Sequence, residues 1–206
     1  MGGERLLDSL QIERPFALYL GRIDPNKGCD ALLRHFQRIQ ASDHRRASGA
    51  VASPVRLVMA GPANMPLPTD APWLTALGHV DAALREALLA HATVLIVPSR
   101  FESLSLVLIE AWNHGVPALV NGRCAALRGQ AMRSGGALCY CNADEFACAL
   151  AYFFEQPDEA RRIGADGLAY VEREYRWPRV MDRIEAQLRA PRTPSSPTGT
   201  ALSAAS

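Results

Sequence analysis

The stretch Phe16-Ala-Leu-Tyr-Leu20-Gly-Arg22-Ile-Asp-Pro-Asn-Lys27-Gly28 decides the fold of this chain of 206 residues. A short, unbroken apolar run ends at a glycine, and a polar loop then leads into an amphipathic segment over about 29–40. Continuous apolar runs are typical of strands that are buried on both faces of a parallel sheet. The order of strand, loop and helix therefore predicts the first unit of an α/β fold.

The same alternation continues along most of the chain. Further strand-like runs occupy 55–60, 93–97, 117–120 and 137–140, and helical segments occupy about 81–91, 105–114, 143–155, 158–174 and 178–189. This order predicts an open parallel sheet wrapped by helices, which is a Rossmann-like α/β domain. In such a sheet ligands bind at the carboxyl ends of the strands. The loops that follow strands are therefore the candidate binding loops: 21–28, 61–72 and 98–105.

The composition sets the domain boundaries that we expect. We predict a leader or linker over 1–15, the Rossmann-like domain over 16–189, and a disordered tail over 190–206, where Pro, Ser, Thr and Ala dominate. The polar, small-residue segment 41–54 is predicted to be a loop.

The overall charge excludes several classes of partner. The formal net charge is +1, so no global field draws the protein to nucleic acid or to an anionic membrane, and any phosphate must be recognised locally. No apolar run is long enough to span a bilayer, and no secretory signal is evident. The five cysteines form an odd set without a CxxC pair, which favours reduced thiols in a cytoplasmic protein over disulfides or a zinc site.

The loop after the first strand carries two cations. A dinucleotide fold places GxGxxG here, and its absence argues against NAD or FAD. Arg22 offers a planar fork and Lys27 a mobile point charge, both at the start of a helix whose N–H groups favour anions. Together they suit a diphosphate. The alternative is that one of them is a solvated surface charge.

The stretch Pro98-Ser-Arg-Phe-Glu102-Ser-Leu-Ser-Leu-Val-Leu-Ile-Glu110-Ala carries two carboxylates. Glu102 lies in the turn after a strand, and Ser103 or Ser105 is expected to cap the helix that follows. Glu110 interrupts an apolar helix that we expect to be buried on most of its circumference. Such a carboxylate needs a partner, either neighbouring backbone or a lysine, or else the hydroxyls of a ligand.

In register, these pieces resemble a known family. Gly21-Arg22-Ile-Asp-x-x-Lys27-Gly28, Gly61-Pro62, and Pro98-Ser-x-x-Glu102-x7-Glu110-Ala with Gly115-x-Pro117 are similar to the family 4 retaining glycosyltransferases of GT-B fold, over roughly 16–180. The resemblance implies that the chain is the C-terminal, donor-binding half of a GT-B fold.

The resemblance also implies roles for single residues. Arg22 and Lys27 hold the diphosphate of the donor, Glu102 lies beside the transferred sugar, and Glu110 accepts hydrogen bonds from the ribose. Val80 lines the base pocket. The implied catalytic set is Glu102, Arg22 and Lys27, and the implied substrate-binding set is Gly21, Arg22, Lys27, Val80, Glu102, Ser103, Leu104, Ser105, Leu106 and Glu110. No metal and no cofactor are expected, because the cations and a helix dipole stabilise the leaving group.

The implied function is retaining, hexosyltransferase-type transfer of a sugar from a UDP- or GDP-sugar to an acceptor. Family members often have Gly-Phe-Gly after the first glutamate, whereas this chain has Ser103-Leu104-Ser105, which leaves the donor open. A full GT-B enzyme has a second, acceptor-binding domain, so we expect a separate acceptor domain or subunit. The alternatives are a non-catalytic sugar-nucleotide-binding module and a flavodoxin-like domain for another anionic ligand.

Overall fold

The computed structural model, which describes residues 2–46 and 55–189, is built around a six-stranded parallel sheet. The strand order is β3-β2-β1-β4-β5-β6, and every pairing is parallel. The strands are β1 (Phe16–Leu20), β2 (Arg56–Ala60), β3 (Leu74–Gly78), β4 (Val94–Val97), β5 (Ala118–Asn121) and β6 (Ala137–Tyr140). The predicted Rossmann-like α/β fold is confirmed.

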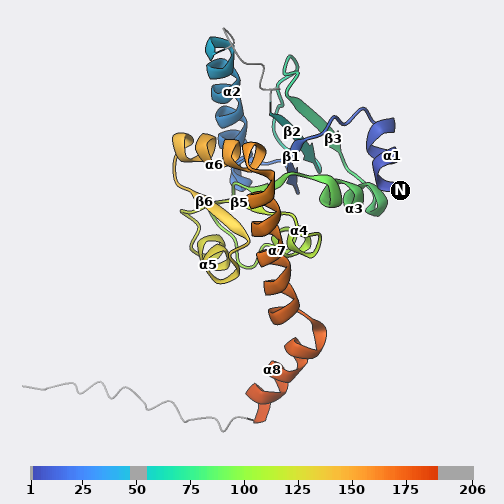
Figure 1. The fold of residues 1–206 in the computed structure, drawn as a ribbon, viewed down its shortest axis with the longest axis vertical. Helices are drawn as coiled ribbons and strands as arrows, with labels where there is room; N and C mark the ends of the chain where they lie inside the picture. Colours follow the sequence, from blue (N-terminus) through green and yellow to red (C-terminus); the bar gives the residue numbers. More distant parts are fainter. Residues whose placement is uncertain (1, 47–54, 190–206) are drawn as a thin grey trace, which may run out of the picture.

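Helices cover both faces of the sheet (Figure 1). One face carries α2 (Cys29–Arg46), α6 (Ala143–Glu155) and the start of α7 (Pro157–Glu174). The other face carries α1 (Gly2–Ser9), α3 (Ala82–His91), α4 (Leu106–Asn113), α5 (Ala125–Ser134) and the end of α7. A short 3₁₀ turn, η1 (Pro25–Lys27), precedes α2, and α8 (Trp177–Arg189) follows α7.

The first strand shows why the apolar runs are continuous. All five residues of β1 are buried: Phe16, Leu18 and Leu20 pack on the face of α1 and α3, whereas Ala17 and Tyr19 pack on the face of α2. Because successive side chains point to opposite faces, a strand with helices on both sides must be apolar at every position.

Three elements were not predicted from the sequence. β3 lies at the sheet edge and none of its five residues is buried, so it has no apolar run. In α5 the pattern AALRGQAMRS buries Leu127, Gln130, Ala131 and Ser134, which mixes polar with apolar positions and hides the helical period. α1 falls in the predicted leader, and its Leu7 is fully buried.

The prediction of a loop over 41–54 is wrong for its first part. α2 continues through Arg46, because Ala, Ser and Arg following an amphipathic helix allow it to extend. The remaining residues of that segment, 47–54, lie outside the described residues, as does the predicted tail over 190–206.

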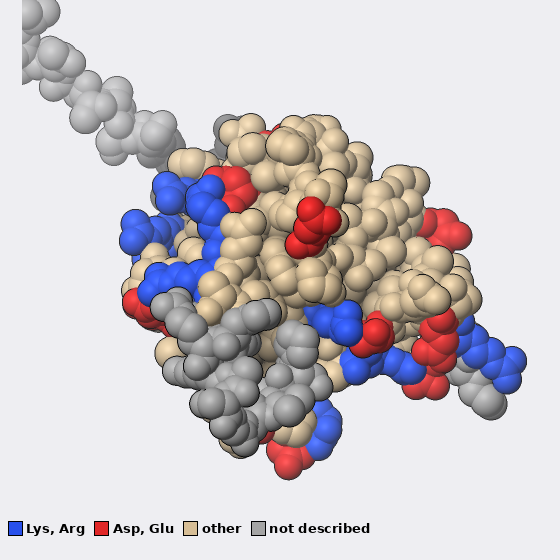
Figure 2. Space-filling view, turned by 90° about the horizontal axis from the view of Figure 1, so that it is seen from above, with Lys and Arg blue, Asp and Glu red and all other residues tan. Residues whose placement is uncertain are grey.

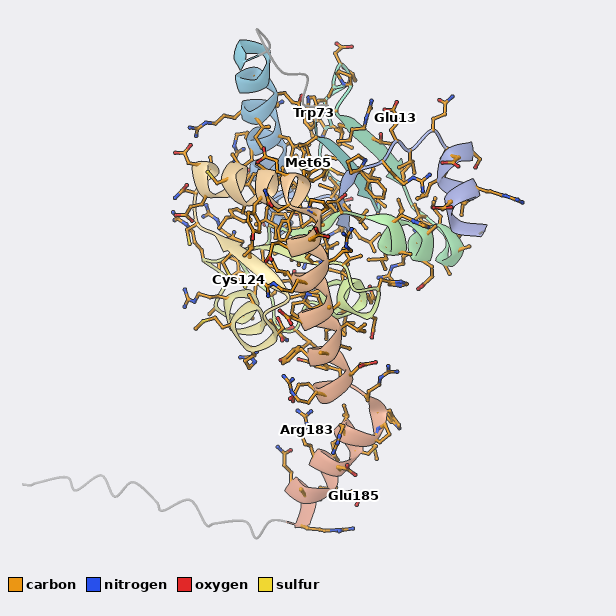
Figure 3. The ribbon with its side chains drawn as sticks, in the orientation of Figure 1. Glu13, Met65, Trp73, Cys124, Arg183 and Glu185 are labelled. Atoms are coloured by element: carbon orange, nitrogen blue, oxygen red, sulfur yellow. The ribbon has the colours of Figure 1, made fainter. Side chains whose placement is uncertain are left out.

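The last helix projects away from the sheet domain (Figure 1). No residue of α8 is buried, and Trp177, Met181, Ile184 and Leu188 recur at helical spacing with exposed fractions of 72%, 36%, 43% and 80%. Figure 3 labels Arg183 and Glu185 on the same helix, well below the sheet. α8 therefore presents an apolar stripe beside charged positions. None of the helices within 2–46 and 55–189 is long and apolar enough to cross a membrane.

Helix α4, which carries Glu110, packs closely against α7 because Gly164 of α7 has no side chain. A Cβ added at Gly164 of α7 would overlap the backbone carbonyl of Gly115, the residue in left-handed conformation just after α4. Trp112 of α4 is fully buried, and its Nε1 donates to the carbonyl of Gly136 at 2.8 Å. Close backbone contact thus fixes the helix that follows β4.

Two glycine substitutions test the contact between Gly164 and Gly115. Gly164→Ala should destabilise the protein by about 1–3 kcal/mol, because the added methyl group forces α7 away from Gly115. Gly129→Ala in α5 is the matched control, since its Cβ would meet only the far end of the long Arg133 side chain and no backbone. That change should raise stability by about 0.5–1 kcal/mol through helix propensity. Thermal unfolding of the two variants measures the change in stability of each. Equal shifts of Tm in the two variants would contradict the packing argument.

Candidate functional site

The predicted binding loops meet where the strand order changes direction. From β1 the chain crosses to β2 through α2 on one face, and from β4 it crosses to β5 through α4 on the opposite face. The two connections therefore leave the sheet in opposite directions between the neighbouring strands β1 and β4. A crevice at the carboxyl ends of such strands is the usual ligand site of this fold. The loops 21–28 and 98–105 lie on either side of this point, and we call the position between them the crevice.

Glycines bring these loops into contact. Gly28 has φ 77°, and a Cβ there would overlap the carbonyl oxygen of Pro98. Gly61 has φ 141°, and a Cβ there would overlap the carbonyl oxygen of Gly21. Any larger residue would separate the loops. The backbone of Ile23 also bonds to the third loop, donating to Pro62 at 2.9 Å.

Lys27 and Glu102 meet across the crevice. Lys27 Nζ donates to Glu102 Oε1 at 2.8 Å, from side chains that are 35% and 15% exposed. The residues lie 75 positions apart in the chain, on the loops after β1 and β4. The sequence placed both residues in loops that follow strands, and the structure makes them direct partners.

Arg22 lies at the rim of the site. Its side chain is 55% exposed, and Nε is 3.7 Å from a carboxylate oxygen of Asp24. Its carbonyl accepts a hydrogen bond from Tyr19 Oη at 2.6 Å. Burial raises the pKa of Tyr19, so the hydroxyl stays a neutral donor that holds the loop. The backbone N–H of Asn26 and the Asn64 side chain help to lower the pKa of Asp24, which therefore stays charged beside Arg22.

Glu110 has a partner within the protein. Its carboxylate bonds to Arg85 Nη2 of α3, and the two side chains are 33% and 40% exposed. The expectation that α4 is buried on most of its circumference is wrong, because only Leu108, Ala111 and Trp112 are buried in it. Glu110 is directed toward α3, the helix that begins just after Val80.

The turn before α4 differs from the predicted cap. Ser105 occupies the cap position in left-handed conformation, φ 57°, and its side chain makes no capping hydrogen bond. The prediction that Ser103 or Ser105 caps the helix through its hydroxyl is therefore not confirmed for Ser105. Ser103 and Leu104 are exposed, and Leu106 is 67% exposed. Three of the four side chains of this turn are thus exposed, whereas Ser105 is buried.

Sequence reasoning missed Asn121, a buried residue that ties the site together. Its Nδ2 donates to the carbonyl of Pro98 at 3.0 Å, and its Oδ1 accepts from the backbone N–H of Arg123 at 3.0 Å. This links the loop after β4 to the loop after β5. The feature of the sequence that could have indicated Asn121 is its position, since it is a polar residue at the end of an apolar strand and precedes Gly122. Arg85 was missed as well, because its ion pair with Glu110 joins two helices that are distant in the sequence and leaves no local pattern.

Charge on the surface is distributed rather than concentrated. Figure 2 shows blue and red side chains interspersed around the edge of one face, with a largely uncharged surface between them. Among the residues described, no group of three or more His, Cys, Asp and Glu side chains is arranged to hold a metal ion. All five cysteines are free thiols.

Comparison with known proteins identifies the family. The model of the family "Glycosyl transferases group 1" matches residues 14–156. The chain belongs to this glycosyltransferase family. The matched range contains both loops that flank the crevice. No curated protein matches the chain in sequence.

Solved structures share the fold. Sucrose-phosphate synthase from Thermosynechococcus elongatus has a TM-score of 0.70 at 22% identity, covering 90% of this chain and 48% of that one. A UDP-forming α,α-trehalose-phosphate synthase from Burkholderia vietnamiensis gives 0.69 at 18%, covering 90% and 46%. The Anabaena protein HepE in complex with UDP gives 0.70 at 16%, covering 90% and 52%. These are GT-B glycosyltransferases, and the chain spans about half of their length.

The ion pair across the crevice yields a measurable coupling. In a double-mutant cycle of Lys27→Met and Glu102→Gln, the pair should contribute about 0.5–1 kcal/mol, a value kept small because Lys27 is partly exposed to solvent. Chemical unfolding of the single and double variants gives the coupling energy. A coupling of zero would mean that the two side chains do not interact in solution.

Proposed function

We propose that this chain is the donor-binding domain of a retaining GT-B glycosyltransferase and that it binds a UDP- or GDP-sugar in the crevice between β1 and β4. The observation that carries the proposal is the meeting of Lys27 and Glu102 at the switch point of the sheet, in a chain of this family. We take residues 16–189 as the domain, in the C-terminal half of the whole fold, with α1 of the preceding segment packed on it through Leu7. The UDP complex of HepE supports a nucleotide ligand for this fold.

The proposed chemistry depends on charge rather than on a metal ion. Breaking the bond between sugar and diphosphate leaves negative charge on the departing phosphate. Arg22 and Lys27 stabilise that charge, one as a planar fork and the other as a point charge. Glu102 positions the sugar, and its carboxylate is kept close to Lys27 at 2.8 Å. The acceptor then attacks on the face from which the diphosphate leaves, so the sugar configuration is retained.

Further groups bind the rest of the donor. Glu110 accepts hydrogen bonds from the ribose hydroxyls, and Val80 lies against the base. Gly21 and the turn Ser103–Leu106 supply backbone contacts to the phosphates and the sugar. Because Arg85 already bonds to Glu110, the ribose must either share this carboxylate or displace the arginine.

We propose that a second domain supplies most of the acceptor site and that the donor-binding domain is inactive alone. The matched structures are about twice as long as this chain. The apolar stripe of α8 is exposed and is the surface that we assign to the contact with that domain. We propose that the two domains together transfer a hexose in the cytoplasm. The free thiols of this chain fit that compartment, which keeps cysteines reduced.

Isothermal titration with UDP and GDP tests the donor site. We expect one of them to bind, and Arg22→Ala and Lys27→Ala each to weaken binding about tenfold or more, because each removes a charge-assisted bond to phosphate. Arg5→Ala, an exposed arginine of α1, is the control and should bind like the wild type. Chelation of divalent ions should change nothing.

The outcomes separate the candidate functions. No binding of either nucleotide, or unchanged affinity in Arg22→Ala, would overturn the donor site. Binding without sugar transfer, when a matching acceptor domain is supplied, would identify a non-catalytic sugar-nucleotide-binding module instead.

A second titration separates the ribose contact from the diphosphate contact. Glu110→Gln should weaken UDP binding about tenfold and leave pyrophosphate binding unchanged, because only the ribose loses a charged acceptor. Glu86→Gln on α3 is the matched control, since Glu86 pairs with His114 and not with Arg85. An equal loss for UDP and pyrophosphate in Glu110→Gln would show that Glu110 acts through the fold of the site.

A further inference from the structure

A second pocket lies beside the crevice, on the side of β5. Its volume is about 650 Å³, and it is lined by residues 100–103 of the loop after β4 and by residues 123–126 at the start of α5. Figure 3 labels Cys124, where α5 begins beside β6. The pocket shares Glu102 with the crevice, so whatever occupies it lies next to the proposed reaction centre. The volume is within the range of small-molecule sites, about 300–1,000 Å³.

The lining of this pocket is positively charged. Arg100 and Arg123 both line it, and Glu102 is its single acidic lining residue. Glu102 is already paired with Lys27 at 2.8 Å. Within the described ranges, neither arginine forms an ion pair with a carboxylate, and Arg100 makes no side-chain hydrogen bond. Two guanidinium groups are therefore left without a counter-charge at the mouth of one pocket.

Arg123 is also held in place. Its Nε donates to the carbonyl of Cys141 at 2.8 Å, and its backbone N–H is bonded to Asn121, which is itself bonded to Pro98. An arginine fixed at Nε and at its backbone retains its Nη donors for a planar anion, with less side-chain entropy to lose on binding. This is a more ordered arrangement than a solvated surface arginine needs.

Apart from Ser103, the remaining lining of the pocket is apolar. Phe101 is 84% exposed, and Ala125 and Ala126 line the pocket from the first turn of α5. An exposed aromatic ring beside two arginines provides a flat apolar face together with a charged fork. A sugar ring carrying an anionic group has the matching combination of apolar face and charge.

We propose that this pocket binds the anionic substituent, a carboxylate or a phosphate, of a sugar held beside Glu102. The inference rests on the proposed donor site and specifies its substrate class: one of the two sugars in the reaction is charged. The charged sugar has two sources, a uronic acid on the donor or a sugar phosphate as acceptor. Arg123 and Arg100 are the residues that select it, and neither belongs to the proposed diphosphate grip.

Calorimetry on the full chain has one arm for each source. The donor arm compares UDP-glucuronate with UDP-glucose, and the acceptor arm compares glucose 6-phosphate with glucose in the presence of saturating UDP. In one arm the charged probe should bind about tenfold tighter than the neutral one. Arg123→Ala and Arg100→Ala should each remove most of that preference while leaving affinity for UDP itself unchanged.

Two further variants test whether the charge preference depends on the guanidinium of Arg123. Arg123→Lys keeps the charge but loses the fork, so it should retain part of the preference, and Arg5→Ala on α1 should retain all of it. If UDP binds but neither arm shows a charge preference, or if the preference survives in Arg123→Ala and Arg100→Ala, this inference is overturned and the donor site stands. If neither UDP nor GDP binds, the proposed function fails, and the inference fails with it; if GDP binds in place of UDP, the same two arms are run with GDP and GDP-sugars.

Discussion

The close approach of two loop backbones at the centre of the sheet is the constraint on which the rest of the site depends. The loops after β1 and β4 diverge to opposite faces, yet they touch at Gly28 and Pro98, where a single Cβ has no room. That contact lets Lys27 reach Glu102 at 2.8 Å from a position 75 residues away. Asn121 then extends the same framework to the loop after β5 through its bonds to Pro98 and Arg123. The site is thus built on backbone contacts at strand ends, which position side chains more reliably than a free loop does.

Sequence reasoning reached the fold and the placement of the main loops for a definite physical reason. Strands buried on both faces must be apolar throughout, so β1, β4 and β5 are visible as runs, and the residues that follow them are candidates for the site. The same logic fails for β3, an edge strand without buried residues, and for α5, whose buried face includes Gln130 and Ser134. Contacts between distant elements are hidden for another reason. Nothing local in the sequence indicates that Arg85 faces Glu110.

Glu110 has a partner, as the sequence predicts, but the helix that carries it is not buried as expected. A carboxylate inside an apolar helix requires a partner, and the sequence leaves open whether the partner is protein or ligand. In the molecule the helix is less buried than its composition suggests, and Arg85 satisfies the carboxylate. Leu104 and Leu106, which contribute to the apolar run, are exposed rather than buried. An apolar composition by itself therefore does not establish that a helix is buried.

The charged residues of the proposed donor site are paired with one another. Lys27 is bonded to Glu102, Arg22 lies near Asp24, and Glu110 is bonded to Arg85. A diphosphate that takes Lys27 and Arg22 must compete with these carboxylates, so the net gain is smaller than the new bonds alone would give. Arg100 and Arg123 have no such carboxylate within the described residues, so an anion in the second pocket binds there without displacing an internal partner.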